Sequence, residues 1–148
     1  MKAKHKRAVE QVVAKLDEFI RQTLVSKGRN GRRQWCTSND LNENGICLFK
    51  VYVRLPIGAV IREIDAKDTR VTNQYGDNWN VLDIASVEAN PCKQGMGTYF
   101  FNLIEEVALG RGLEFIRVES VLNSHVATII KRKEYVGDEG GNYHKRIR

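Results

Sequence analysis

The first hydrophobic pattern along the chain is helical. Between Lys4 and Val25, apolar residues recur every three or four positions, which is the spacing of one buried helix face. That face consists of Val9, Val12, Val13, Leu16, Phe19, Ile20 and Leu24. Gly28 follows soon after, and glycine is common just beyond the last turn of a helix. The pattern therefore predicts one amphipathic helix over these residues.

A polar stretch separates this helix from the first strand signal. Lys27–Asn44 is rich in glycine and asparagine, and we expect it to form a mobile loop that contains Trp35. Ile46–Leu55 is almost continuously apolar and predicts a strand that is buried on both faces. Weaker signals predict two further strands and a turn, at Ala59–Ile64, Thr69–Thr72 and Gln74–Asn80.

The second half of the chain predicts a strand, a loop, a helix and a strand in that order. Val81–Ala89 is the first strand, and the helix covers about Gly97–Leu109. Glu114–Leu122 is the second strand. This order is a βαβ unit, so we expect the two strands to be parallel and joined by a right-handed crossover. A short helix over about Asn123–Lys133 and a last short hairpin complete the expected elements.

Simple alternation assigns the side chains of the Val81–Ala89 strand to two faces. One face receives Leu82, Ile84, Ser86 and Glu88. The other face receives Val81, Asp83, Ala85 and Val87. Asp83 and Glu88 are therefore expected on opposite sides of the sheet.

The segment Cys92–Thr98 joins this strand to the helix that follows it. Gly95 and Gly97 carry no side chain, so a ligand can approach the backbone closely. Free N–H groups at the helix start suit an anion, and a diphosphate above all. Met96-Gly97-Thr98 lacks the lysine of a P-loop, and the dinucleotide fingerprint lacks one of its glycines. A tight turn with no ligand is the alternative that two glycines leave open.

Composition is that of an ordinary globular domain. The chain has 148 residues, of which 42% are apolar and 28% charged, and we expect one domain over residues 1–148. No run approaches the roughly 18 apolar residues that cross a membrane, and Met1–Arg7 is not followed by the apolar run of a secretory signal. Cys36, Cys47 and Cys92 are odd in number and far apart, which disfavours disulfides and a zinc site and suits a cytoplasmic protein with reduced thiols.

The formal charge of +6 is concentrated at the two chain ends and in the stretch after the first helix. Nucleic acid, a polyanionic cofactor and an acidic substrate would each complement it. Simple solvation of the chain ends explains the pattern equally well.

From Val81 to about Val136 the chain resembles the GNAT superfamily of acetyl-CoA-dependent N-acetyltransferases. The glycine loop of that family reads Arg/Gln-x-x-Gly-x-Gly/Ala, and the segment Cys92–Gly97 matches both glycines with cysteine in the first place. Asn123–Val126 resembles the family's Asn-x-x-Ala segment, and Lys131–Val136 resembles its closing Lys-x-Gly-Phe. The resemblance implies an α/β fold with a central mixed, mostly antiparallel sheet flanked by helices.

The resemblance also implies a coenzyme A site. Backbone groups of Ala85, Ser86 and Val87 would pair with the pantetheine arm like an added strand. Asn123 would lie near the thiol end of the cofactor. The diphosphate would be held by the loop residues Lys93, Gln94, Gly95, Met96, Gly97 and Thr98.

The implied reaction is direct attack of an amine on the acetyl thioester, which requires a base. Asp83 is the first candidate and Glu88 the second, while Glu63 or Asp65 could act through water. Ile130 occupies the place where many family members have a tyrosine that protonates the leaving thiolate.

Two functions remain open from the sequence. The first is an N-acetyltransferase for a primary amine on a small molecule or a protein. The second is a GNAT-like module with weak or no catalysis that binds a protein or a nucleic acid. Family members usually begin with a strand, whereas here a helix candidate starts almost at once, so we expect the sheet to lack that strand. An open sheet edge could support a homodimer. A Ser-His-Asp or Cys-His hydrolase has no support, because no nucleophile elbow precedes His125.

Overall fold

The computed structural model describes residues 1–26, 32–55, 81–119, 124–137 and 141–148. Three helices and six strands lie in these ranges. The helices are α1 (Ala3–Ser26), α4 (Met96–Gly110) and α5 (Ser124–Arg132). The strands are β1 (Arg32–Thr37), β2 (Phe49–Leu55), β3 (Val81–Ala89), β4 (Phe115–Val118), β5 (Val136–Gly137) and β6 (Tyr143–Arg146).

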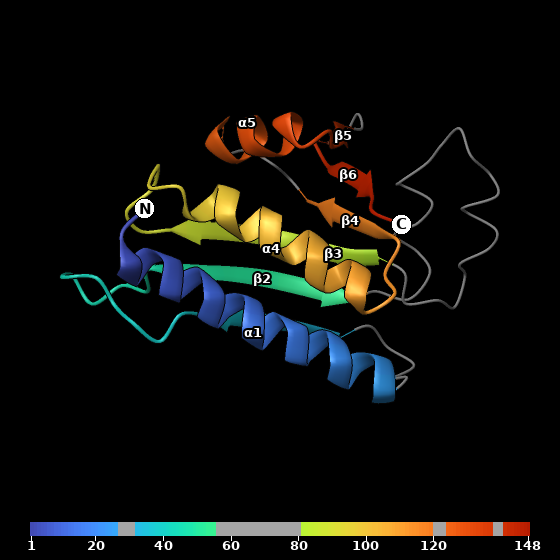
Figure 1. Ribbon diagram of the computed structural model, residues 1–148, viewed down its shortest axis with the longest axis horizontal. Coiled ribbons are helices and arrows are strands. Elements are labelled where there is room, and N and C mark those ends of the chain that lie inside the picture. Colours follow the sequence, from blue (N-terminus) through green and yellow to red (C-terminus); the bar gives the residue numbers. More distant parts are fainter. Residues whose placement is uncertain (27–31, 56–80, 120–123, 138–140) are drawn as a thin grey trace.

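The strands form one six-stranded sheet in the order β1-β2-β3-β4-β6-β5. Only β3 and β4 are parallel, and every other neighbouring pair is antiparallel. The parallel pair is joined through α4, as expected for the βαβ unit (Figure 1). The predicted fold class, a mixed and mostly antiparallel sheet with helices against it, is therefore confirmed.

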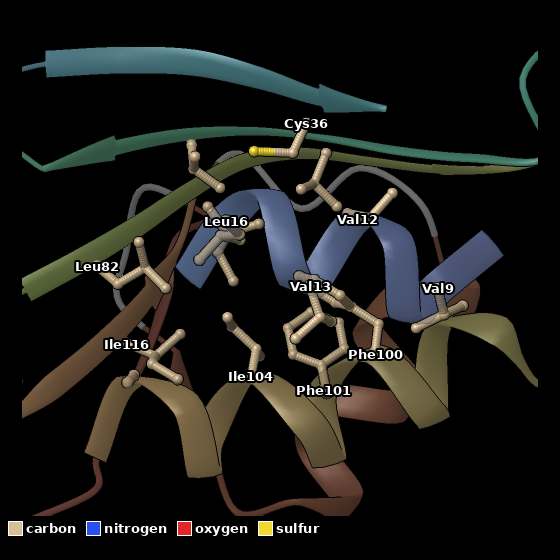
Figure 2. Close-up of a cluster of buried hydrophobic side chains, with 14 of the residues drawn as sticks. Val9, Val12, Val13, Leu16, Cys36, Leu82, Phe100, Phe101, Ile104 and Ile116 are labelled. Atoms are coloured by element: carbon tan, nitrogen blue, oxygen red, sulfur yellow. The ribbon is translucent and has the colours of Figure 1, made fainter. Parts of the chain in front are cut away.

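Helices α1 and α4 pack against one face of this sheet and against each other (Figure 1). Figure 2 shows their buried side chains meeting beneath the strands, with Leu16 from α1 and Phe100 and Ile104 from α4. All three of these side chains are fully buried. The amphipathic helix predicted from Lys4 to Val25 is confirmed, since its apolar face supplies much of this core.

Strand β2 is buried on one face only. Its burial alternates strictly, and Val51 and Val53 are fully covered while Tyr52 and Arg54 are half-buried. The prediction of burial on both faces is therefore wrong. The reason is that Tyr52 and Arg54 belong to the sheet face opposite α1, where their polar ends stay accessible.

Residues Arg32–Thr37 form an edge strand rather than the expected loop. They pair antiparallel with β2, and Trp35 lies opposite Tyr52 with a distance of 5.0 Å between ring centroids. Four of the six residues are exposed, so the strand lacks the alternation that would reveal it in sequence. Pairing with β2, rather than burial, fixes its conformation.

A β-bulge in β3 changes which residues share a face. Tyr52 pairs with Ser86 but Val53 pairs with Ile84, so Ala85 is an extra residue on β3. Beyond the bulge, Ser86 therefore joins the face of Asp83, and so does Glu88. Val87 moves to the core side, where it packs against the buried cluster. The face assignment from simple alternation is wrong for these residues, because it assumed a regular strand.

Several expected features lie outside the described residues. These are the weak strands Ala59–Ile64 and Thr69–Thr72, the turn Gln74–Asn80, and the candidate residues Glu63, Asp65 and Asn123. In the described part of the chain, α1 is the first element. Among the same residues, no helix has the length and apolar character that a membrane crossing requires.

Candidate functional site

The parallel strands β3 and β4 separate at the middle of β3. Their pairing runs from Val81 opposite Phe115 to Ile84 opposite Val118. The Glu119 N–H donates to the Ile84 carbonyl at 2.9 Å, and this is the last contact between the two strands in the described residues. β3 continues for five more residues, Ala85 to Ala89, with its bulge at the point of separation. On the β4 side, the described residues therefore supply no hydrogen-bonding partner for Ala85 to Ala89.

The glycine loop joins the end of this half-strand to the start of α4. Lys93 and Gly95 have positive φ angles of 60° and 83°, and Gly95 is the residue that caps α4. The Tyr99 N–H donates to the Gly95 carbonyl at 3.1 Å, which is the first helical hydrogen bond. The N–H groups of Met96, Gly97 and Thr98 therefore have no acceptor within the helix. Because the first turn contains no acidic side chain, this end of α4 suits an anion.

The two glycines of the loop have different roles. A Cβ at Gly95 would meet no atom within 4 Å, so the left-handed backbone, rather than crowding, requires glycine there. A Cβ at Gly97 would approach Ile129 Cδ1 at 3.0 Å. Gly97 therefore permits α5 to pack close to α4, in addition to lining the ligand side. Both glycines were expected to let a ligand approach the backbone, with a tight turn as the alternative, and packing against α5 was not expected.

A cleft of about 210 Å³ lies where β3, the glycine loop and α5 meet. From β3 and the loop it is lined by Val87, Glu88, Ala89, Asn90, Cys92, Lys93, Met96 and Gly97, and from α5 by His125, Val126 and Ile129. The sequence predicted Val87, Lys93, Met96 and Gly97 as cofactor contacts, and the structure brings all four to this cleft. Gln94 lines a separate hollow instead, and Thr98 is exposed at the start of α4.

The chemical groups around this cleft fit those of a coenzyme A molecule. The half-strand Ala85–Ala89 offers backbone groups to an extended amide chain, as an edge strand does. The start of α4 offers N–H groups to a diphosphate, and Lys93 adds a positive charge beside it. A cleft between a free strand edge and a helix N-terminus matches both parts of such a cofactor.

Asp83 lies beside the separation point in a buried cluster of charges. It is 1% exposed, and Arg117, directly opposite on β4, is 4% exposed. Arg117 Nη1 lies 3.8 Å from Asp83 Oδ2 and 3.0 Å from Glu119 Oε1. Arg54 Nη1 from β2 lies 3.0 Å from Glu119 Oε2. Two arginines therefore hold two carboxyl groups together at this point of the sheet.

Burial raises the pKa of Asp83 to about 8, and the neighbouring Glu119 carboxylate adds to this effect. Arg117 and Arg54 oppose the rise in pKa, but they do not cancel it. Among the described residues, neither carboxyl oxygen of Asp83 has a hydrogen-bond partner. With a pKa of about 8, the Asp83 carboxyl group is mostly protonated at neutral pH and exchanges its proton close to that range.

Glu88 has a different environment from Asp83. Its carboxylate lies 3.1 Å from Lys50 Nζ, and its side chain is about half exposed. The bulge places both acids on the same sheet face, which corrects the expectation of opposite faces. An exposed, lysine-paired carboxylate is the ordinary surface arrangement, so the structure distinguishes Asp83 from Glu88 by burial.

The position that many GNAT proteins fill with tyrosine is buried in this chain. Ile130 is fully covered and belongs to the hydrophobic core. Tyr135 packs against Phe101 and is 5% exposed, and burial followed by the Glu105 charge raises the pKa of its hydroxyl. Neither residue lines the cleft. His125 does line it.

Sequence reasoning missed Arg54, Arg117 and Glu119, the charged partners of Asp83. A signal was available, because Arg117 interrupts an otherwise apolar strand and Asp83 interrupts the parallel strand next to it. Two opposite charges in adjacent buried strands point to a paired site. What the sequence could not supply was the register that puts them opposite each other.

No protein-family model and no curated protein matches this sequence. Among solved structures, a putative acetyltransferase from Staphylococcus aureus Mu50 matches with a TM-score of 0.51 and 16% identity, covering 95% of this chain and 89% of that chain. A putative acetyltransferase from Agrobacterium tumefaciens matches with a TM-score of 0.47 and 14% identity, covering 99% and 93%.

At 16% identity the first match shows similarity of fold alone. The chain therefore shares the fold of that structure, a mixed and mostly antiparallel sheet flanked by helices, which is the fold that the GNAT resemblance implies.

Proposed function

We propose that this protein is an N-acetyltransferase that transfers an acetyl group from acetyl-CoA to a primary amine. The observation that carries the proposal is the separation of β3 and β4 at the bulge, next to the glycine-capped start of α4. This arrangement provides a strand edge and an anion site in one cleft. Acetyl-CoA, when bound, supplies the activated acetyl thioester.

In this proposal the protein acts by positioning and by accepting a proton. The backbone of Ala85, Ser86 and Val87 holds the pantetheine arm, and the N–H groups from Lys93 to Thr98 hold the diphosphate. Asn123, which lies outside the described residues, is proposed near the thiol end. An ammonium acceptor would first give a proton to ionised Asp83, and the free amine would then attack the thioester carbonyl. A C–N bond forms, the C–S bond breaks, and coenzyme A leaves as a thiolate; the amide nitrogen loses a proton, and the thiolate takes one up, through solvent.

Asp83 suits this role through its place and its pKa. It precedes Ile84, the last residue of β3 paired with β4, and it lies on the same strand as Val87 and Glu88, which line the cleft. With a pKa of about 8, it becomes an acceptor as the pH rises through that value. Glu119, with an 18% exposed side chain, connects the buried carboxyl with the surface. Glu88 remains the second candidate base.

Binding is tested first, by calorimetric titration with acetyl-CoA. We expect a single site with a dissociation constant well below 1 mM. An absence of heat at millimolar acetyl-CoA, in protein whose fold is verified by circular dichroism, would overturn the proposal.

Catalysis is tested by release of free coenzyme A thiol in the presence of a panel of amines. We expect Asp83→Asn to lower kcat by about 10²–10⁴-fold with little change in acetyl-CoA affinity. Glu106→Gln, an exposed acid on α4, serves as the charge-matched control. Loss of activity in Glu88→Gln but not in Asp83→Asn would transfer the base role to Glu88.

The buried Ile130 favours a second candidate, a GNAT-like module with weak or no turnover that contacts a macromolecule. It predicts acetyl-CoA binding without acetylation of any amine in the panel. If such a module bound nucleic acid, its affinity would fall steeply with salt. A flat salt dependence between 50 and 200 mM would exclude that partner.

A further inference from the structure

A second hollow, of about 580 Å³, lies on the other side of the glycine loop. It is formed by the start of α1, the turn around residues 42–46 and the loop after β3. Asn90 lines both this hollow and the cofactor cleft, so the two meet at that residue. In Figure 1 the N-terminal end of α1 lies beside the loop that joins β3 to α4.

His5 is the buried polar residue of this hollow. It is 2% exposed, and its Nδ1 atom has no hydrogen-bond partner among the described residues. Burial lowers the pKa of His5, and the charges of Lys4 and Lys2 lower it further. A buried imidazole without a partner, beside two ammonium groups, is an arrangement that a bound anion would stabilise.

The basic residues at the two chain ends differ in their pairing. At the C-terminal end, Lys145 lies 2.7 Å from Glu105, and Arg146 lies 3.6 Å from Glu114. At the other end, Lys2 and Lys4 line the hollow and have no ion pair with any described residue. The positive charge at the start of α1 is therefore available to a ligand.

The rest of the lining is mostly neutral and polar. Glu43 is its one acidic residue, and Asn42, Asn44 and Gln94 contribute carboxamide groups. The Asn42 oxygen already accepts the Asn44 and Ile46 N–H groups at 2.8 and 3.0 Å, so its amide nitrogen is the end left to donate. The hollow thus combines cations and donors, which suits a phosphate group attached to a polar body.

We propose that this hollow holds the 3′-phosphate end of coenzyme A, with Lys2, Lys4 and His5 around the phosphate. The inference rests on the proposed function, because it assumes a diphosphate at the start of α4. The part of the cofactor beyond the diphosphate must leave the glycine loop on one side. The side at Asn90 and Gln94 leads directly into the hollow.

The test compares acetyl-CoA with 3′-dephospho-acetyl-CoA by calorimetry at fixed ionic strength. Wild type should bind the phosphorylated form about tenfold more tightly or better, as expected for charge-assisted hydrogen bonds. Lys2→Ala/Lys4→Ala should reduce this preference to less than twofold while leaving the affinity for the dephospho form unchanged. Lys6→Ala/Arg132→Ala removes the same charge from residues outside both hollows and should keep the preference.

A second readout follows the His5 imidazole by NMR. The charged groups that line its hollow are Lys2, Lys4 and Glu43. Acetyl-CoA should raise the pKa of His5, and the dephospho form should leave it unchanged. Equal binding of both forms by wild type would overturn the inference and leave the proposed function standing. So would a preference that survives in Lys2→Ala/Lys4→Ala, whereas binding of neither form would defeat the proposed function itself.

Discussion

The burial of Asp83 makes its ionisation costly to the folded protein. A carboxyl group buried beside a second carboxylate is costly in its charged form, and the two arginines compensate only in part. The residue therefore keeps its proton to a higher pH in the folded protein than in the unfolded chain. This makes the folding free energy depend on pH.

We expect the unfolding free energy of wild type to fall between about pH 5 and pH 8. The folded-state pKa of Asp83 is about 8 against an ordinary value of 3.8, so the native state binds the extra proton in this window. Stability is lost as the pH rises toward 8, by at most about 1.4 kcal/mol per pH unit. Asp83→Asn, measured by urea denaturation at pH 5, 7 and 9, should remove this slope. Parallel pH curves for the two proteins would contradict the assigned environment.

Gly95 gives a second prediction at this scale. Its φ of 83° lies in the left-handed region, which costs an L-residue about 1–2 kcal/mol. Gly95→Ala should destabilise the fold by that amount in chemical denaturation, and Gly95→Asn by less, because asparagine tolerates this conformation. Gly110→Ala, also on α4 but with no positive φ and open space around it, should be neutral or stabilising. Equal effects at Gly95 and Gly110 would show that the backbone geometry is not limiting.

At the scale of elements, α1 depends on burial rather than on local interactions. Its apolar face packs on β2 and α4, and Leu16 is fully buried within that core (Figure 2). Leu16→Ala should lower the unfolding free energy by about 2–5 kcal/mol in denaturant titration. Glu10→Ala, at an exposed position of the same helix, should change it by less than about 0.5 kcal/mol. A similar loss at both positions would mean that helix propensity, rather than the core, limits stability.

The elements that sequence predicted well are those with a strong period. The helix from Lys4 to Val25 has one, and it appears with nearly the expected bounds. The strand Val81–Ala89 also has the expected bounds, but its alternation is broken by the bulge. Strand β1 was missed because its two faces are both polar and its order comes from pairing with β2.

The bulge at Ala85 was missed for a different reason. One inserted residue reverses the alternation, and no local property of Ala85 announces it. Asp83 could be proposed as the base from its position in the strand. Its charged partner Arg117 could not be predicted, because the register between β3 and β4 places the two residues opposite each other. The hollow at His5 depends on a tertiary contact between distant segments.

At the scale of the molecule, ligand binding should stabilise the whole fold, because the cleft joins β3, α4 and α5. Acetyl-CoA at about 100 times its dissociation constant should add about 2.7 kcal/mol. For a chain of this length, that corresponds to a rise in Tm of about 5–11 °C. Differential scanning calorimetry with and without the ligand measures it. A rise that is equally large with free adenine would indicate nonspecific stabilisation instead.

The backbone amides of the half-strand Ala85–Ala89 should differ in their rates of hydrogen–deuterium exchange. On the β2 side its amides are held in the sheet, whereas on the other side the described residues supply no strand beyond Glu119. In the free protein, deuterium should therefore replace the protons on the open side far sooner than those of Val81–Ile84. A ligand that completes the sheet would slow these few amides selectively. Comparing the exchange rates of the Ala85–Ala89 amides with and without ligand would thus show whether the pantetheine arm pairs with this strand. The comparison also works for a variant that transfers no acetyl group.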